Sequence, residues 1–168
     1  PMRTEQPVTI HRSDYRPPAF RIETIDLVFD LDPAQTIVRS RLYVCRNDGI
    51  APDAPLELDG EALELIEIAL DGRLLDASEW LLTDAGLSID RVPDQFTLEV
   101  ATRICPQDNT ALSGLYVSNG NFYTQCEAQG FRRITFFPDR PDVMARYRVT
   151  LRADRSRWPV LLSNGNPV

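Results

Sequence analysis

Short apolar segments that alternate with polar residues make up most of the chain, and turn-forming residues separate them. Over Phe20–Leu31 the apolar residues recur at about every second position, which is the period of a strand with one buried face. The phase of this alternation changes between Ile22 and Ile25, and a β-bulge would absorb the change. The turn at residues 32–35 leads into a second such segment, Ile37–Arg46, so we expect these two strands to form a hairpin.

Further strands are expected at short intervals along the rest of the chain. Asp71 and Gly72 lie between two of them and are a strong signal for a two-residue hairpin turn. The expected strands are Pro55–Leu58, Leu63–Leu70, Arg73–Leu75, Trp80–Thr83, Leu87–Asp90, Phe96–Ile104, Gly114–Tyr116, Asn121–Cys126, Ile134–Phe137, Ala145–Ala153 and Val160–Leu162.

Helical periodicity is scarce, because 13 prolines and 8 glycines interrupt the chain too often for long helices. Only Glu127–Ile134 is compatible with a helical turn or two, and Gly130 weakens that segment. The pattern therefore predicts an all-β domain of two or three packed, mostly antiparallel sheets with at most one or two short helical turns.

The domain organisation follows from chain length and from the two ends. A chain of 168 residues suits one core, so we expect a single all-β domain over residues 18–168. Residues 1–17 are expected to form an extended N-terminal arm, because the sequence Tyr15–Pro18 favours extended and polyproline conformations. The turn-rich stretch Ser163–Val168 has no closing element, which suggests a domain excised from a larger multidomain enzyme.

Charge and apolar content exclude several classes of partner. The chain carries 18 basic residues, all of them Arg, against 25 acidic residues, and its net charge of −7 gives no footprint for a polyanion. We therefore expect no nucleic-acid partner. No stretch approaches the ~18–20 apolar residues of a membrane-spanning helix, and no export signal is recognisable, so we expect no membrane association. Three cysteines at wide spacings favour a reducing compartment, and the expected location is cytoplasmic.

Nucleophilic and metal chemistry find little support in the residue types present. The only histidine, His11, lies in the polar arm, so a triad is nearly excluded and a solvated side chain is the favoured interpretation. His11 with Cys45, Cys105 and Cys126 would supply the atom types that zinc prefers, but no two of them form a local ligand pair. Buried, inert cysteines are the favoured interpretation, and we expect no metal site in this chain.

Carboxylates are numerous enough for acid–base chemistry but are placed as surface residues. The acids at positions 57, 59, 64 and 67 alternate with apolar residues along expected strands, which is typical of the solvated face of a sheet. Asp139–Asp142 is interpreted first as a structured turn with an Arg–carboxylate pair. Gly120 and Gly130 do not fit any phosphate-binding glycine pattern.

The segment Tyr123–Arg133 departs from this plain alternation. If Thr124–Ala128 is extended, residues two apart share a face, so Gln125 and Glu127 point one way and Cys126 points towards the core. That arrangement would display a polar pair at the end of a strand. The alternative is an ordinary strand end with a solvated acid.

This segment also carries a resemblance to a known family. The stretch Thr124–Arg132, continuing through Ile134–Phe137 to Asp139–Val143, resembles the N-terminal domain of bacterial aminopeptidase N, a zinc-dependent alanyl aminopeptidase of the gluzincin class. The resemblance covers nearly the whole chain. Its other matching stretches are Asp14–Pro17, Ile25–Leu27, Phe29–Leu31, Asn109–Leu112, Gly114–Tyr116 and Leu161–Asn166.

The resemblance implies a parent enzyme of several domains that removes single residues, with an alanine-type preference, from peptide N-termini. In that family the N-terminal domain is a saddle of several sheets that borders the active site, and the zinc-binding motif lies in the following domain. It thus implies zinc as the parent's cofactor, the catalytic and C-terminal domains of the same chain as partners, peptides as substrates, and no activity of this fragment by itself.

The roles implied for individual residues are few. Glu127 matches the family's glutamate that binds the substrate α-amino group, and Gln125 matches the glutamine that lines the pocket for the first side chain. Arg132, Asp139, Arg140 and Pro141 also match, and we interpret them as structural supports of that strand end. The alternative from another class is a free-standing β-sandwich module that binds a peptide or carbohydrate without catalysis.

Overall fold

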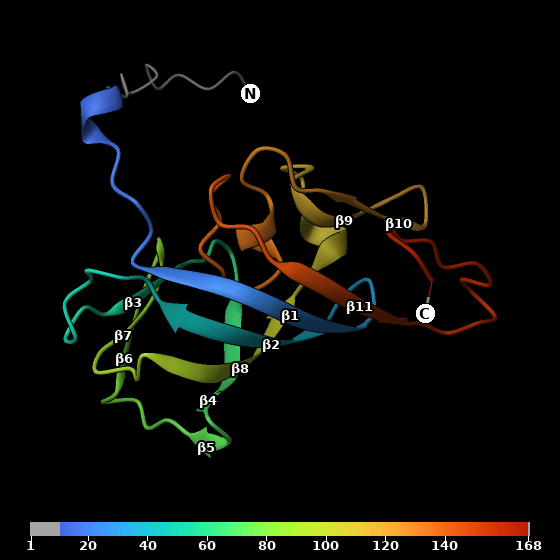
Figure 1. Cartoon of the computed structure of the whole chain (residues 1–168). Helices are drawn as coiled ribbons and strands as arrows, with labels where there is room; N and C mark the ends of the chain where they lie inside the picture. The colour runs from blue at the N-terminus through green and yellow to red at the C-terminus, as the bar shows by residue number, and fades with distance from the viewer. Residues whose placement is uncertain (1–10, 168) are drawn as a thin grey trace.

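A computed structural model describes residues 11–167, and its regular structure consists almost entirely of strands (Figure 1). The largest sheet has six strands in the order β11-β1-β2-β8-β4-β5. Their bounds are β1 (Phe20–Asp30), β2 (Thr36–Arg46), β4 (Glu64–Leu70), β5 (Arg73–Leu74), β8 (Gln95–Ile104) and β11 (Arg146–Arg152). A three-stranded sheet contains β3 (Leu56–Asp59), β7 (Gly86–Ile89) and β6 (Trp80–Thr83), and a two-stranded sheet contains β9 (Gly114–Ser118) and β10 (Asn121–Gln125).

The strand pairing follows local sequence signals. Strands β1 and β2 form the expected antiparallel hairpin, and their register shifts between Ile22 and Thr24, where the alternation changes phase. Asp32 closes their turn, because its carboxylate accepts hydrogen bonds from the backbone N–H groups of residues 34 and 35. Asp71 and Gly72 both have positive φ at the β4–β5 turn, as a two-residue hairpin requires. Among the strands of residues 11–167, only β1 and β11 pair in parallel.

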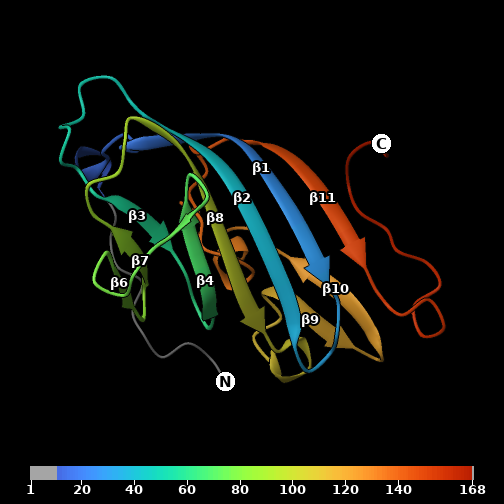
Figure 2. The same ribbon diagram turned by 90° about the horizontal axis from the view of Figure 1, so that it is seen from below.

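The core lies between one face of the large sheet and the two smaller sheets, which Figure 2 shows beside its curved strands. Alternate residues of β1, β2 and β8 supply the large-sheet side of this core. Leu56 and Ile89 of the three-stranded sheet and Leu115 of the two-stranded sheet belong to the same buried cluster. The prediction of an all-β domain with several packed sheets is therefore confirmed.

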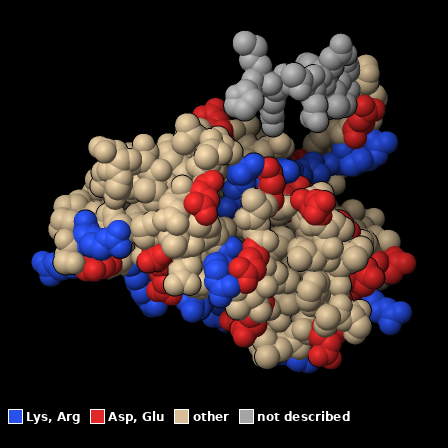
Figure 3. Space-filling view, turned by 180° about the vertical axis from the view of Figure 1, so that it is seen from behind, with Lys and Arg blue, Asp and Glu red and all other residues tan. Residues whose placement is uncertain are grey.

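The opposite face of the large sheet is polar. Ion pairs connect neighbouring strands there, including Arg39 with Asp30, and Arg41 with Glu99 at 3.5 Å. Acidic and basic side chains are interspersed over the side of the molecule seen in Figure 3. This mixing gives no concentrated basic surface on that side.

Two expected strands are absent from the described residues. Ile134–Phe137 contributes only an isolated bridge between Asp59 and Phe137, because the backbone N–H groups of Ile134 and Thr135 bond back to Phe131 and hold the segment in a turn. Val160–Leu162 is exposed and pairs with no strand. The apolar character of the two segments was correctly recognised, but only the first is buried.

Helical structure in the described residues is limited to single 3-10 turns. The third, η3 (Phe131–Arg133), falls inside the segment where a turn was expected. The other two, η1 (Arg12–Asp14) and η2 (Pro106–Asp108), were not predicted. η2 begins with a proline, whose fixed φ suits a first helical position, and η1 is closed by the Asp14 carboxylate on the His11 backbone N–H at 3.2 Å. No helix in the described residues is long and apolar enough to span a membrane.

Residues 1–10 of the expected N-terminal arm lie outside the described residues. Over residues 11–17 the chain is exposed and runs through η1 into an extended stretch that ends at β1. Two contacts tie this stretch to the rest of the domain: the Tyr15 hydroxyl donates to Asp142 at 3.0 Å, and Arg140 donates to the Arg16 carbonyl at 2.8 Å. The described part of the arm is therefore attached to the domain at one point.

Candidate functional site

The β9–β10 hairpin carries the first of the predicted site residues. Asn119 and Gly120 form its turn with positive φ, which matches the twist of the flanking strands. Trp158 anchors the hairpin from outside, since its indole N–H donates to the Gly120 carbonyl at 3.0 Å and its ring lies 5.0 Å from that of Phe122. The strand β10 then ends at Gln125 (Figure 1).

The chain turns immediately after Gln125, so the expected extended segment Thr124–Ala128 is only partly correct. Residues 127–130 form a turn, which the Gly130 backbone N–H closes on the Cys126 carbonyl at 2.8 Å. The physical reason is the glycine: a Cβ at Gly130 would collide with the Gln125 carbonyl oxygen, so only glycine lets the chain fold back this closely.

The structure nevertheless brings Gln125 and Glu127 together. The Gln125 side-chain amide donates a hydrogen bond to the Glu127 carbonyl at 3.2 Å, and both side chains are exposed. The pair is thus joined by a turn instead of by alternation along one strand. It forms an exposed ledge that combines an amide and a carboxylate.

Cys126, between them, lies half-buried against the core cluster, as its predicted inward direction requires. Burial raises the pKa of its thiol, and the nearby Asp139 carboxylate raises it further. A thiol with a raised pKa is a poor nucleophile at neutral pH. Cys126 therefore acts in packing.

Arg132 and Asp139 form the brace beneath this turn. The Arg132 Nε and backbone N–H both donate to one Asp139 carboxylate oxygen, at 3.2 and 3.1 Å, and a guanidinium N–H reaches the Asp139 carbonyl at 3.0 Å. Asp139 is only 9% exposed. These two predicted supports are thus in direct contact and attach η3 to the segment after Phe137.

Asp59 completes the brace, and no pattern along the chain predicts this role. It was expected on a solvated sheet face, which is wrong: it lies 3.3 Å from the Arg132 guanidinium and accepts the Asp139 backbone N–H at 2.9 Å. It stands far from both partners in the chain, so no local spacing links them. The brace therefore ties the end of β3 to η3.

Arg140 belongs to a different cluster. Its guanidinium binds the Asp142 carboxylate through two hydrogen bonds of 2.9 and 2.7 Å, which confirms the expected Arg–carboxylate turn, and Pro141 lies inside that turn. The hydrogen bonds from Arg140 lower the pKa of Asp142. Because Tyr15 bonds to Asp142 and Arg16 bonds to Arg140, this cluster holds the described part of the arm, whereas the hydrogen bond of Gln125 goes to Glu127.

The described residues offer no arrangement that fits a zinc ion. No group of three or more His, Cys, Asp and Glu side chains among them is placed to hold a metal. His11 is exposed in the arm, and the Cys105 thiol lies 3.1 Å from the Asp108 carboxylate. The alternative zinc site from His11 and the three cysteines is thus not formed by the described residues.

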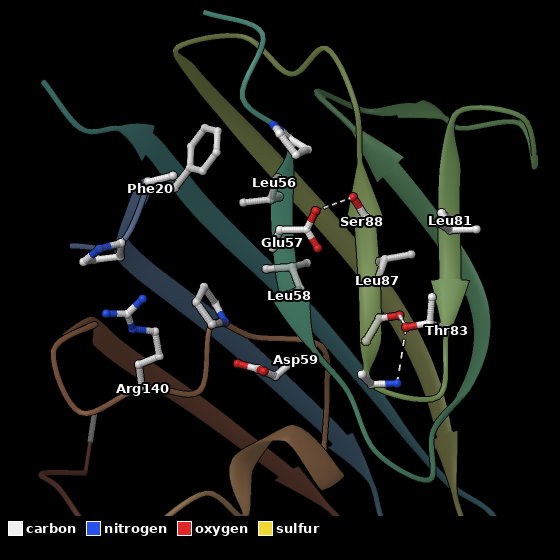
Figure 4. Close-up of a pocket in the computed structure, with 16 residues that line it drawn as sticks. Phe20, Leu56, Glu57, Leu58, Asp59, Leu81, Thr83, Leu87, Ser88 and Arg140 are labelled. Carbon is white, nitrogen blue, oxygen red and sulfur yellow. Dashed lines mark hydrogen bonds between the residues drawn. The ribbon is translucent and has the colours of Figure 1, made fainter. Parts of the chain in front are cut away.

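A cleft of about 550 Å³ lies elsewhere, at the edge of β3 (Figure 4). Glu57 points along this cleft and accepts a hydrogen bond from the Ser88 hydroxyl at 2.7 Å, while Arg140 lies at its other end. Neither Gln125 nor Glu127 lines it. The candidate site is therefore an open ledge, distinct from this cleft.

Comparison with known proteins identifies the relatives of this chain. It is 52% identical over 167 residues to aminopeptidase N of Caulobacter vibrioides, covering 99% of this chain and 19% of that protein. Among solved structures, Legionella pneumophila aminopeptidase A in complex with aspartic acid matches with a TM-score of 0.84 and 36% identity, over 91% of this chain and 18% of the other.

A more distant structure shares the fold. A variant of the M1 zinc metallopeptidase of Deinococcus radiodurans, bound to a Tyr-Ser-Ala substrate, matches with a TM-score of 0.66 and 17% identity over 80% of this chain and 33% of that one. The chain spans about a fifth of the length of the curated relatives that it matches. Residues 67–168 match the model of the peptidase M1 N-terminal domain, and the chain belongs to that family.

Proposed function

We propose that this chain is the N-terminal domain of a longer zinc-dependent aminopeptidase, in which Glu127 binds the α-amino group of a peptide substrate. The observation that carries the proposal is the ledge itself: Gln125 and Glu127 are both exposed, and the Gln125 side-chain amide donates to the Glu127 backbone carbonyl at 3.2 Å, next to the segment that Arg132 and Asp139 hold. Family membership and the names of the relatives support it.

The chemistry of the ledge suits a peptide N-terminus. A protonated α-amino group has three N–H donors and a positive charge, and a carboxylate and an amide oxygen are the acceptors that it needs. Glu127 would supply the charge, and Gln125 would contact the first side chain of the substrate. Neither residue is required to transfer a proton.

The described residues contain no group that fits zinc, so the metal and the hydrolytic step would belong to another part of the parent protein. In that parent the zinc would supply the Lewis acid of the hydrolysis. We expect the isolated domain to have no peptidase activity. An alanine-type preference and a cytoplasmic location are parts of the same proposal, and the three free thiols are compatible with a reducing compartment.

An exposed apolar surface supports the presence of a partner within the parent chain. Met144 is 82% exposed, and Tyr147 and Val149 of β11 are also exposed. Contiguous exposed apolar side chains are typical of surfaces that another protein part covers. We propose that the catalytic and C-terminal domains of the parent pack against this side.

The test uses the full-length protein that carries this domain, assayed for release of p-nitroaniline from an alanyl anilide with and without a zinc chelator. We expect activity that the chelator abolishes and zinc restores. Glu127→Ala should lower kcat/KM by about 30-fold or more, because loss of one partner of a desolvated charge pair costs about 2–5 kcal/mol. A folded but inactive wild-type protein would contradict the proposal and favour a peptide- or carbohydrate-binding module.

A further inference from the structure

We propose that Tyr123, supported by Tyr116, forms the outer wall of the pocket for the first side chain of the substrate and extends its acceptance from alanyl to larger apolar side chains. This inference rests on the proposed function and specifies its substrate class. It concerns a pair of aromatic side chains beside the ledge that neither the brace nor the core uses.

The register of the β9–β10 hairpin places these rings. Tyr123 precedes Gln125 by two positions in β10, so the two side chains share a face of the hairpin and their positions lie about 7 Å apart. Tyr116 pairs directly with Tyr123, and their rings are stacked at 5.8 Å with an interplanar angle of 23°. The opposite face carries Leu115 and Phe122, which pack inwards.

A bare position completes the arrangement. Gly114 pairs directly with Gln125, so β9 itself places no side chain across from the amide on this face. A side chain there is excluded, because φ is +76° and a Cβ would lie 2.7 Å from the Arg133 Cβ. Arg133 and the Gly130 carbonyl lie against Gly114, so the rings of Tyr116 and Tyr123 are the next side chains of the hairpin on the same face as Gln125.

The exposure of Tyr123 and the order of the residues along β10 favour the first side chain of a substrate as the group that contacts the rings. Tyr123 is 47% exposed although its ring is stacked, so one surface of the pair remains available. The order of the residues, counted from the proposed ammonium site back along the chain, is Glu127, Gln125 and Tyr123. A methyl side chain beside Gln125 is too short to reach the rings, whereas a leucyl or phenylalanyl side chain can contact them.

The test compares kcat/KM of the full-length protein for alanyl, leucyl and phenylalanyl p-nitroanilides. Tyr123→Ala should lower the phenylalanyl-to-alanyl ratio by about 5- to 10-fold, since stacking on an aromatic ring contributes at about that level. Tyr123→Phe keeps the ring and should leave the ratio within about twofold. Tyr123→Thr, which is well suited to a strand, repeats the ring deletion and guards against a folding defect of the alanine variant.

Tyr43→Ala is the matched control, because Tyr43 is an exposed tyrosine on another sheet that does not adjoin the ledge, and it should leave the ratio unchanged. The ratio is measured within one preparation, so it does not depend on the fraction of folded enzyme. Equal losses for all three substrates, or no change in the ratio, would overturn the assignment and leave the rings as a hairpin-stabilising pair. If Glu127→Ala loses activity but Tyr123→Ala keeps the wild-type phenylalanyl-to-alanyl ratio, the role of Tyr123 is wrong and the proposed function stands. An inactive wild-type protein would contradict both the role of Tyr123 and the proposed function.

Discussion

Two glycines determine where the ledge residues stand. Gly114 lets Arg133 and the Gly130 carbonyl lie directly against β9 opposite Gln125, and Gly130 allows the turn after β10 to close against the strand end. Gly130 has an ordinary φ of −90°, so its requirement comes from contact and not from backbone conformation. The positions of the Gln125 amide and the Glu127 carboxylate therefore depend on two neighbouring residues that have no side chain.

Gly130→Ala should lower the free energy of unfolding by about 1–3 kcal/mol, because the added Cβ meets the Gln125 carbonyl and lies 2.9 Å from the Ser113 hydroxyl. Urea unfolding followed by tryptophan fluorescence measures the loss. Gly49→Ala is a control at which the new Cβ meets no atom within 4 Å, so it carries only the cost of its positive φ. A Gly130→Ala protein as stable as the wild type would show that the turn relaxes freely.

At the scale of secondary structure, the brace formed by Arg132, Asp139 and Asp59 adds ion pairs to elements that backbone hydrogen bonds between Asp59 and Phe137 already connect. It joins the end of β3 to η3 and to the segment after Phe137. Only 19% of the Arg132 side chain and 12% of the Asp139 side chain are exposed. Partly buried charges of this kind fix relative position because an unpaired partner is costly.

Arg132→Met should therefore lower the free energy of unfolding by about 2 kcal/mol, since it leaves two carboxylates without their cation. Arg148→Met is the matched control, because Arg148 is 74% exposed and lies 3.8 Å from Asp26. We expect the control to change stability by less than about 0.5 kcal/mol. Equal effects of the two substitutions in urea unfolding would show that the brace has no special role.

The elements also show which features a sequence can predict. The β1–β2 hairpin and its bulge follow from alternation within a few residues, and the structure has both. The turn after Gln125 is a local feature that Gly130 closes on Cys126, but alternation alone does not show it. The role of Asp59 depends on contacts with a distant segment, which spacing along the chain does not encode. Ile134–Phe137 was predicted as a strand because it is apolar, but tertiary contacts bury it as a turn.

The residues proposed for the candidate site come from the sequence, whereas their geometry comes only from the fold. The stretch around Gln125 and Glu127 was singled out from the sequence, and in the structure the Gln125 side chain donates to the Glu127 backbone carbonyl. Arg140 was interpreted as a support of that ledge, yet it binds Asp142 and the arm. The matching motif contains both clusters, and only the fold separates them.

At the scale of the whole molecule, the Asp142 cluster attaches the N-terminal arm to the last third of the chain. The Arg140 hydrogen bonds lower the pKa of Asp142 in the folded protein. A group with a lowered folded-state pKa stabilises the protein above its unfolded value of about 4, and this contribution is lost as the pH falls through the folded-state value.

Asp142→Asn should thus be less stable than the wild type at pH 7, and the difference should shrink as the pH falls below about 4. The hydrogen bond from the Tyr15 hydroxyl also lowers the pKa of Asp142, and it raises the pKa of Tyr15. Tyr15 therefore does not titrate between pH 7 and pH 3, and the change in stability over this range comes from Asp142. Urea unfolding at pH 7 and at pH 3 measures both differences. A difference of the same size at the two pH values would rule out the ionised carboxylate as its source.

The central claim is that Glu127 recognises the free amino group of a substrate, and one comparison tests it directly. In the full-length protein, kcat/KM is measured for an alanyl anilide and for the propionyl anilide, which differs only by lacking the amino group, with wild type and Glu127→Gln. The account predicts a strong wild-type preference for the alanyl compound that falls by about 30-fold or more in the variant. An unchanged preference in Glu127→Gln would contradict the assignment of this carboxylate.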